Sequence, residues 1–280
     1  MVSLSNHEGR ALPRHQRARG TGRLTTQQVA GRTRIETLYQ EGCAKIRLPH
    51  THDLSLQAVL INTAGGLTGG DNVAWQVDVA PMSRVVLTTQ ACERVYRSLG
   101  DDAVVRTRLR VGAGAHLDWL PQETILFDGA RLNRALDVEL EGDASLFAIE
   151  AILLGRSAMG ETARSAHLLD NWRIRRDGRL VHAESTRLSA AELERDALST
   201  LAGNAAFATL VYLGADAEQR EARVAGLLSG TLAGPSGLSR IGERLVIRAM
   251  ADSGLALRRI ITPIIAELSG AGALPRLWHL

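Results

Sequence analysis

The sequence predicts a mainly β fold of stacked β-sheets, in a sandwich or solenoid-like arrangement, with a small helical part in its C-terminal third. Up to about Glu184, apolar and polar residues alternate in short segments that recur roughly every ten residues. Helix signals come only after about Ser189. Because a doubly wound α/β fold places a helix between successive strands, this order argues against that fold.

Three segments show the alternation clearly. In VAWQVDV, the apolar side chains on one side are Val73, Trp75, Val77 and Val79. The same period continues in VRTRLRV (105–111) and in RLNRALDVEL (131–140), where Arg134 falls on the side of the leucines. Such alternation is typical of strands that bury one side.

Further strands are predicted beyond these three. WRIRRDGRLVHAE (172–184) predicts a β-hairpin, because Asp177 and Gly178 tolerate the positive φ angles of a tight turn. RLVIRAM (244–250) predicts a strand after a connection rich in Gly, Pro and Ser. The tryptophans on apolar sides of predicted strands, expected in the core, are Trp75, Trp119 and Trp172. Trp278 is expected to be a tail anchor or a partner contact.

Helices are predicted within about 189–268. Ser189 and Glu192 form a capping-box pattern ahead of AAELERDALSTLA (190–202). A second helix is predicted from about Ala217 to Leu228, and a third over LALRRIITPIIAEL (255–268). Pro263 inside the third is expected to kink or break it.

The N-terminal segment is strongly basic. Between Glu8 and Glu36 the chain has seven arginines and no acidic residue, so residues 1–22 are predicted to form a disordered basic arm and residues 23–280 a single β-rich domain. The arm is interpreted either as solvated or as a contact for an acidic partner.

Overall charge does not indicate nucleic-acid binding. The net charge is only +3, and Lys45 is the only lysine, so a GC-rich genome explains the arginine content more simply. Aromatic residues make up 4% of the chain, which argues against stacking on single-stranded nucleic acid. The rival interpretation, a basic nucleic-acid-binding module, predicts binding that falls steeply with salt.

The sequence also indicates the compartment. No apolar run approaches ~18 residues and no signal-peptide pattern is present, so neither a membrane span nor export is expected and the cytosol is predicted. Cys43 and Cys92, the two cysteines, are then expected to be reduced thiols.

A glycine-rich loop, LINTAGGLTGGDNV (60–73), raises the possibility of phosphate binding. A P-loop requires a lysine, a hydroxyl and then a helix after its last glycine. Here Asp71 follows Gly70, its carboxylate would repel phosphate, and the next segment alternates like a strand. The glycines are therefore interpreted as serving the backbone conformation, with Asp71 accepting hydrogen bonds from loop amides.

Four segments carry a resemblance to a known family. LINTAGGLTGGD, LTTQACERVYRS, WLPQETILFDGARLNR and LLGRSAMGE occur in this order, and together they resemble urease accessory protein D (UreD, called UreH in some organisms). GRTRIETLYQEGCAKIRLP and WRIRRDGRLVHAE fit as well, so the resemblance extends from about Gly31 to the C-terminus. Cys92 departs from the pattern, because many members have alanine there.

The resemblance implies a maturation factor rather than an enzyme. Family members are similar in acting as scaffolds on apo-urease with the accessory proteins UreF and UreG. The assembly delivers nickel, with UreG using GTP, and supports carboxylation of the active-site lysine of urease. A β-rich stack of sheets and a water-filled passage for nickel are further expectations. No tightly bound cofactor is expected, and nickel contact is expected to be transient at most. The amphipathic pattern of the late helices, rather than the resemblance, suggests that they contribute to a surface for UreF.

Within the family segments, one set of residues is expected to act structurally, in partner binding or in lining a passage. It consists of Gly65, Gly66, Gly69, Gly70, Asp71, Gln90, Glu93, Arg94, Gln122, Glu123, Asp128, Glu150 and Glu161. The structural interpretation pairs Glu93 with Arg94 or Arg97, and Glu161 with Arg156 or Arg164. The functional interpretation has some of these acids hold a divalent ion weakly enough to release it.

Two other chemistries remain open. His50 and His52 alternate on an extended segment and could grip nickel, but they lack a third fixed ligand, so a solvated loop is the simpler interpretation. A β-rich hydrolase using paired carboxylates such as Glu123 and Asp128 is the alternative function.

Overall fold

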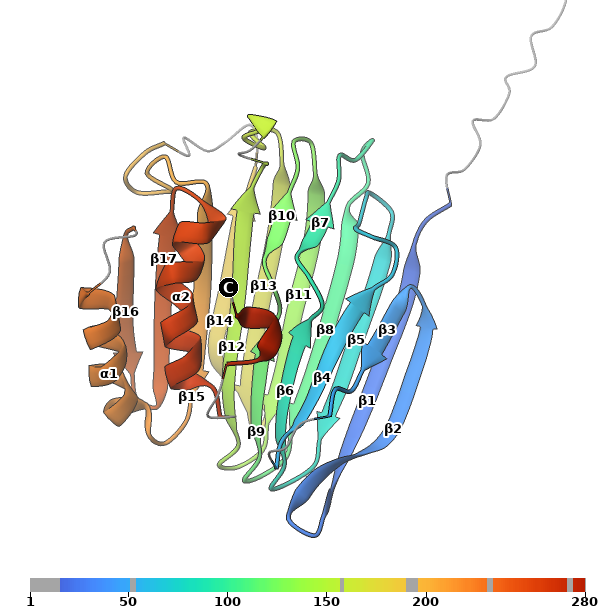
Figure 1. The fold of residues 1–280 in the computed structure, drawn as a ribbon, viewed down its shortest axis with the longest axis vertical. Coiled ribbons are helices and arrows are strands. Elements are labelled where there is room, and N and C mark those ends of the chain that lie inside the picture. Colours follow the sequence, from blue (N-terminus) through green and yellow to red (C-terminus); the bar gives the residue numbers. More distant parts are fainter. Residues whose placement is uncertain are drawn as a thin grey trace, which may run out of the picture.

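Two stacked β-sheets form the body of the molecule (Figure 1). The computed structural model describes residues 16–50, 54–156, 159–189, 196–230, 234–270 and 274–279. Sheet A contains, in spatial order, β14 (Arg179–Leu188), β13 (His167–Arg176), β11 (Arg131–Leu140), β8 (Ala103–Val111), β5 (Asn72–Val79), β1 (Arg19–Val29) and β2 (Arg32–Gly42).

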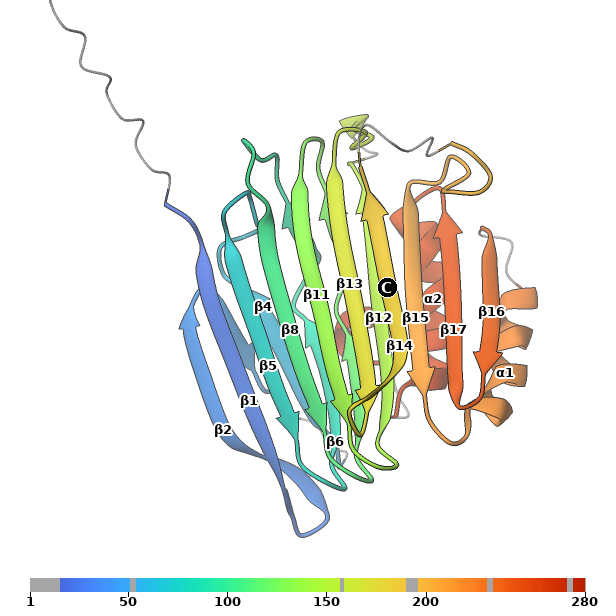
Figure 2. The same cartoon turned by 180° about the vertical axis from the view of Figure 1, so that it is seen from behind.

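Sheet B lies behind sheet A in Figure 2. It contains, in spatial order, β16 (Ser236–Ile241), β17 (Arg244–Ala251), β15 (Ala206–Leu213), β12 (Ser145–Leu154), β9 (His116–Leu120), β6 (Arg84–Thr89), β4 (Leu56–Asn62) and β3 (Ala44–Arg47). Two short strands, β10 (Thr124–Leu126) and β7 (Glu93–Val95), pair beside β12.

The chain winds between the sheets like a solenoid. It passes from β5 to β6, from β8 to β9 and from β11 to β12, alternating between sheet A and sheet B. Successive turns therefore pair in parallel within each sheet, as β5 with β8 and β6 with β9. The predicted mainly β, stacked and solenoid-like fold is confirmed.

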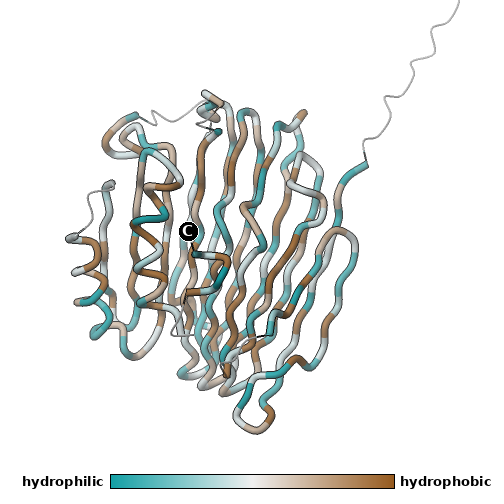
Figure 3. The backbone as a smooth tube through the Cα atoms, viewed as in Figure 1, coloured by the Kyte–Doolittle hydropathy of each residue, from teal (hydrophilic) through white to brown (hydrophobic). Residues whose placement is uncertain are grey.

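The predicted alternation corresponds to burial between the sheets. The four apolar residues of VAWQVDV are buried, whereas Ala74, Gln76 and Asp78 are less so. Figure 3 shows hydrophobic and hydrophilic residues alternating along the strands. Arg134 is also buried, on the side that the pattern predicted. The predicted hairpin is β13–β14, and its turn has positive φ at both Asp177 (48°) and Gly178 (76°).

Two α-helices cover the outer face of sheet B near β15 and β17. Helix α1 (Ala217–Ser229) and helix α2 (Gly254–Leu268) confirm the second and third predicted helices. Pro263 lies inside α2 without ending it, so the predicted break is wrong. Ile260 and Ile264 on the buried side of α2 pack against sheet B, and this burial offsets the cost of about 3 kcal/mol for an interior proline.

The first predicted helix is not found in its described part. Residues 196–203 form turns, and residues 190–195 lie outside the described part of the chain. A capping box depends only on neighbouring residues and says nothing about tertiary packing. Because most helices in proteins are stabilised by packing of an apolar side, the capping-box pattern alone does not ensure a helix.

The N-terminal end of sheet A begins earlier than the predicted boundary. Strand β1 starts at Arg19, within the segment assigned to the basic arm, and pairs with β2 on one edge and β5 on the other. Residues 1–15 lie outside the described part. At the other end of the chain, a short 3-10 helix, η2 (Arg276–Trp278), places Trp278 in the core. Among the described helices, none is both long enough and apolar enough to cross a membrane.

Candidate functional site

The glycine-rich loop connects β4 to β5 and is fixed by backbone contacts. The Leu67 amide donates to the Arg94 carbonyl at 2.7 Å, and the Gly70 amide donates to the Asp102 carbonyl at 3.0 Å. Gly66 has φ of +143°, and a Cβ there would lie 2.4 Å from the Tyr96 ring. The loop therefore requires glycine for close approach to its neighbours. Gly65 has a positive φ but open space around it.

Asp71 closes this loop from inside. Its buried carboxylate accepts from the Thr68 amide and from the Ala18 amide, both at 2.7 Å. The prediction that Asp71 accepts hydrogen bonds from loop amides is confirmed. Strand β5 begins at Asn72 directly after it, so no helix N-terminus is available for a phosphate and the backbone interpretation of the loop holds.

Glu93 lies beneath the loop with an amide partner rather than an arginine. The Asn62 side chain donates to both Glu93 carboxylate oxygens, at 3.2 and 3.3 Å, and also to the Gly66 carbonyl. Burial raises the pKa of Glu93 to about 7. The predicted pairing of Glu93 with Arg94 or Arg97 is wrong, because Arg94 is exposed and Arg97 contacts Asp128 instead.

A buried ion cluster crosses the space between the sheets. Arg134 of β11 bonds Asp170 of β13 at 2.7 Å and contacts Glu150 of β12 at 2.5 Å. Although burial alone would lower the pKa of Arg134, the two carboxylates raise it. Burial raises the pKa of Glu150, while Arg134 opposes this shift. The Trp119 indole donates to Glu150 at 3.0 Å.

The glycine loop, Glu93 and this cluster border one small cavity. Its volume is about 60 Å³, enough for one or two waters at ~30 Å³ each. Three of the residues predicted as candidates, Glu93, Gln122 and Glu150, line it, and Thr89, Thr124 and Arg134 add further polar atoms. The sequence placed these residues in separate segments, whereas the winding of the chain brings them together.

Glu123 anchors the C-terminal helix to sheet B. Arg258 of α2 donates from Nε to Glu123 at 2.6 Å, and also bonds the Gln122 side chain. Burial would raise the pKa of Glu123, but the Arg258 contact lowers it below its usual value. The Arg258 guanidinium lies 5.0 Å from the centre of the Trp278 ring. Burial, with the Glu123 charge, raises the pKa of the Cys92 thiol to about 11.

Asp128 and Glu161 fix loops at one end of the sheets. Asp128 accepts from the Ser165 hydroxyl at 2.6 Å, which lowers its pKa, and lies 3.4 Å from Arg97. Glu161 bonds Arg156 at 2.7 Å, which confirms one of the two pairings predicted for it and lowers its pKa.

The remaining candidates have less distinctive surroundings. The Gln90 amide donates to the Leu60 carbonyl. His50 is exposed, and His52 lies outside the described part of the chain. Within the residues that the structure describes, three or more potential ligands of His, Cys, Asp or Glu type nowhere gather in a metal-binding arrangement.

A second polar cluster was not predicted. His116 contacts Asp118 at 2.8 Å and Ser145 at 2.7 Å through its two ring nitrogens. Asp118 also accepts from Ser269 at 2.7 Å, so the cluster ties the end of α2 to β9. The sequence gives no signal for it, because Asp118 and Ser269 are separated by 151 positions.

Comparisons with known proteins cover nearly the whole chain. A family model described as UreD urease accessory protein matches residues 18–279, further toward the N-terminus than the resemblance from Gly31 predicted. The protein named "Urease accessory protein UreD" of Chelativorans sp. (strain BNC1) is 62% identical over 268 residues, which is 95% of each chain.

More distant relatives carry the same name. The protein of Rhizobium etli is 51% identical over 270 residues, 95% of this chain and 97% of its own. That of Agrobacterium fabrum is 47% identical over 269 residues, 95% of this chain and 93% of its own. The similarity therefore includes both sheets and both helices.

Proposed function

Because the chain belongs to the UreD family of urease accessory proteins, and so has a role in urease maturation, we propose that it serves as a non-catalytic scaffold. In this proposal it holds apo-urease together with UreF and UreG in the cytosol while nickel is inserted. The observation that carries the proposal is that acids of the family segments hold the fold together. Glu123 bonds Arg258 and Asp128 bonds Ser165, each in another segment, and Glu161 accepts from the Asp128 amide.

The charge state of these acids supports a non-catalytic role. A glycosidase-type pair needs one carboxyl group with a raised pKa, so that it is protonated and can donate a proton. The contacts of Glu123 and Asp128 lower the pKa of both, so both are ionised at neutral pH. They also belong to separate clusters, one at α2 and one at the loop of Ser165. This disfavours a carboxylate hydrolase that uses Glu123 and Asp128 as its pair.

The small cavity supports a second part of the proposal, a passage for nickel. Glu93, Gln122 and Glu150 offer oxygen atoms around it. Oxygen ligands hold a divalent nickel ion less tightly than thiolate or several imidazoles, so an ion that binds here could also leave. Nickel is then cargo rather than a resident cofactor.

The scaffold proposal is tested in a urease-producing strain that lacks the gene. We expect urease in this strain to be assembled but nickel-poor and inactive, and the wild-type protein to restore both nickel content and activity. Normal activation without the protein would contradict the proposal. So would turnover of a glycoside or ester by the isolated protein that is lost in Glu123→Gln.

The passage is tested with variants in the same strain. Glu93→Gln and Glu150→Gln keep the shape of the side chain and remove its ionisable group, so we expect urease with less nickel although the complex still co-purifies. Glu36→Gln, on the exposed strand β2, is the matched control and should activate urease fully. Full nickel content with both cavity variants would exclude the passage while leaving the scaffold intact.

A further inference from the structure

One broad face of the molecule is left uncovered. Helices α1 and α2 pack on the outer face of sheet B. On the outer face of sheet A, which points away from sheet B, no described helix or strand crosses the sheet (Figure 2). The strands from β1 to β13 span about 20 Å at ~4.8 Å between neighbours, and a strand such as β5 is about 26 Å long. This flat surface has room for a face of another protein.

Arginines dominate the side chains on this surface. Side chains alternate along each strand, and those that point inward, such as Leu109 of β8 and Val138 of β11, belong to the core. The outward positions of β1, β5, β8, β11 and β13 carry more arginines than acids. The arginines are Arg19, Arg23, Arg106, Arg108, Arg110, Arg131, Arg173 and Arg175, and the acids are Asp78, Asp137 and Glu139. We call this surface the arginine face.

The surplus of positive charge is local. The whole chain has 33 arginines and lysines against 30 acidic residues, so acids elsewhere on the molecule nearly balance the charge gathered here. Like charges close together on a surface repel one another and oppose the compact state. Folding alone therefore gives no reason to collect arginines on one face.

The register of the strands sets the pattern of charge. In one row across sheet A, Asp137 of β11 lies between Arg108 of β8 and Arg173 of β13. The next row repeats this arrangement with Arg110, Glu139 and Arg175. Each of these two acids therefore has an arginine on both sides, and positive charge remains in excess along the rows.

Arg108 and Arg110, at the centre of the face, have no partner for their charge. Both are exposed, and among the described residues neither side chain has a hydrogen bond or an ion pair. Glu139 beside Arg110 instead accepts from the Gly178 amide at 2.7 Å. The two guanidinium groups are thus free to receive carboxylates from outside the chain.

Two neighbouring arginines are held in place without being neutralised. Arg106 donates to the Asn133 carbonyl at 2.8 Å, and Arg173 donates to the Glu184 carbonyl at 3.1 Å. A carbonyl oxygen fixes the position of a guanidinium group but carries no net charge. These contacts therefore order the face and leave it positive.

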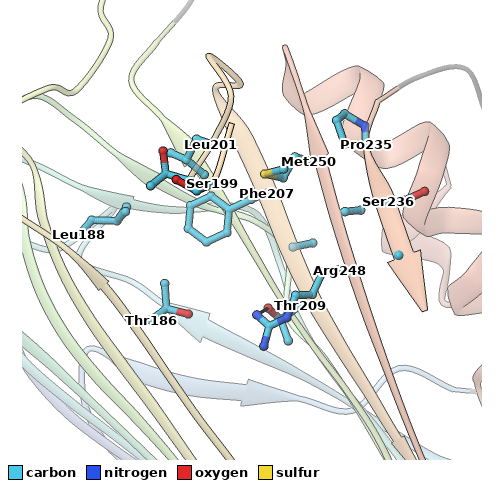
Figure 4. A pocket seen from close by; sticks show the side chains of 14 residues that line it. Thr186, Leu188, Ser199, Leu201, Phe207, Thr209, Pro235, Ser236, Arg248 and Met250 are labelled. Atoms are coloured by element: carbon cyan, nitrogen blue, oxygen red, sulfur yellow. Dashed lines mark hydrogen bonds between the residues drawn. The ribbon is translucent and has the colours of Figure 1, made fainter. Parts of the chain in front are cut away.

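Arginines on the inner sides of the sheets are arranged differently. Arg134 contacts two buried carboxylates. Arg248 lines a pocket of about 540 Å³ at the end of β14, where it bonds Glu184 at 2.5 Å and lies beside Thr209 (Figure 4). Arg108 and Arg110 differ from both in lacking a carboxylate, so arginine content alone does not define the arginine face.

We infer that the arginine face docks a partner protein of the urease machinery through a flat, carboxylate-rich surface of that partner. A guanidinium group pairs with a carboxylate through two parallel hydrogen bonds, and Arg108 and Arg110 offer this geometry at the centre of the face. Charge complementarity of this kind steers association and excludes partners of the wrong charge. The inference rests on the proposed scaffold function, for which it names one contact surface.

The acids within the face favour a protein over a nucleic acid. A phosphate backbone is negative along its whole length, so Asp78, Asp137 and Glu139 would repel it at several points. A folded protein can place a positive or neutral side chain opposite each of these acids. The outward positions of these five strands also carry no aromatic side chain on which a base could stack.

Binding at two salt concentrations tests the inference. The full-length protein is immobilised and presented separately with purified apo-urease, UreF and UreG. For one component we expect the dissociation constant to rise about tenfold or more between roughly 0.05 M and 0.5 M sodium chloride, because salt screens exposed charges. The double variant Arg108→Gln with Arg110→Gln should raise the dissociation constant of the same component about tenfold at the lower concentration.

The matched control removes the same charge from another part of the surface. Arg47→Gln with Arg84→Gln changes two exposed arginines of sheet B, on β3 and β6. This double variant should bind the component as the wild type does. Any general effect of net charge would appear in both double variants alike.

Chemical protection of arginines makes the test independent of how the variants fold. Phenylglyoxal modifies accessible guanidinium groups, and mass spectrometry locates the modified residues. In the wild-type complex, Arg108 and Arg110 should be shielded from the reagent, whereas Arg84 should react as it does in the free protein.

The outcomes separate this inference from the function on which it rests. If the wild type binds none of the three components, the proposed scaffold function fails. If it binds one, but Arg108 and Arg110 stay reactive or their double variant binds equally well, only the present inference fails. Binding of a double-stranded DNA oligonucleotide that this variant loses, with no component shielding the two arginines, would assign the face to nucleic acid instead.

Discussion

Gly66 and Gly69 are required for steric reasons that the glycine pattern alone did not specify. A Cβ at Gly69 would lie 2.1 Å from the Ser98 hydroxyl, although the φ of Gly69 is not in the left-handed region. At Gly66 the close neighbour is the Tyr96 ring, and φ is also positive. The sequence predicted that these glycines serve the backbone conformation, but the residues in contact with them lie about 30 positions away and could not be named.

We expect Gly66→Ala to lower the free energy of unfolding by about 1–3 kcal/mol, because strain and a clash act together. Gly226→Ala is the control. Gly226 lies inside α1 with open space around it, so alanine should stabilise the helix by roughly 0.5–1 kcal/mol. Urea denaturation of both variants measures the difference. An unchanged midpoint for Gly66→Ala would contradict the backbone role of the loop.

Glu93 gives a pH-dependent prediction. Its pKa is raised to about 7 in the folded protein, against ~4.3 in an unfolded chain. Between these values the native state binds more protons than the unfolded state, so stability falls as the pH rises through this window. In Glu93→Gln this contribution is absent. The variant should therefore gain roughly 2 kcal/mol on the wild type between pH 5 and pH 8. Parallel stability curves in urea titrations would contradict the raised pKa.

The burial of Arg134 could be predicted, but its partners could not. Its place among the leucines of β11 predicted the buried side. Asp170 and Glu150 come from strands that only the fold brings beside it, one in each sheet. The alternation of side chains predicts which side of a strand is buried. It does not predict which other strand packs against that side.

At the scale of elements, the contact between α2 and sheet B depends on Arg258. Its side chain and that of Glu123 are 17% and 3% exposed. We expect Arg258→Met to cost about 3 kcal/mol of stability, because it leaves a buried carboxylate without its cation. Adding Glu123→Gln should restore part of this loss, which a double-mutant cycle measures.

A solvent-exposed ion pair provides the control for this prediction. Arg164 and Asp196 form a pair with both side chains about two-thirds exposed, at 65% and 66%. Arg164→Met should therefore cost less than about 1 kcal/mol. Equal losses for Arg164→Met and Arg258→Met would show that burial does not determine the strength of the contact.

A sequence signal predicted an element correctly where the element depends only on residues close together in the sequence. The Asp177-Gly178 turn requires only two positive φ angles, and the hairpin formed as expected. Pro263 was expected to kink or break a helix, but α2 continues through it because packing on sheet B, a tertiary effect, opposes a break. Residues 196–203 illustrate the reverse case, because Ala197, Leu198, Leu201 and Ala202 favour a helix and yet this segment forms turns.

At the scale of the whole molecule, β1 joins the edge strand β2 to the rest of sheet A. It pairs in parallel with β5 and antiparallel with β2, and Leu24 is fully buried. Deleting residues 2–30 should therefore abolish cooperative unfolding, measured by circular dichroism, because β2 loses its partner. Deleting residues 2–15 leaves every described element in place and is the control. A cooperative transition at an unchanged temperature in the longer deletion would contradict this role of β1.

The fold class could be predicted because alternation, turn residues and late helices are all local in sequence. The order of strands within each sheet could not. β1 lies beside β5 although β2, β3 and β4 separate them in the chain, and such parallel neighbours depend on long-range packing that no single segment encodes. The cavity between the sheets is formed by this winding of the chain. The sequence therefore predicted Glu93, Gln122 and Glu150 as candidates one by one, but not that they line the same cavity.

The core position of Trp278 has a consequence for how the protein is produced. Its indole donates to the Leu120 carbonyl at 3.0 Å, and Leu277 accepts from Gln122. These contacts join Leu277 and Trp278 to residues 155 and 158 positions earlier in the chain, so they form only after this late segment has been synthesised and has left the ribosome.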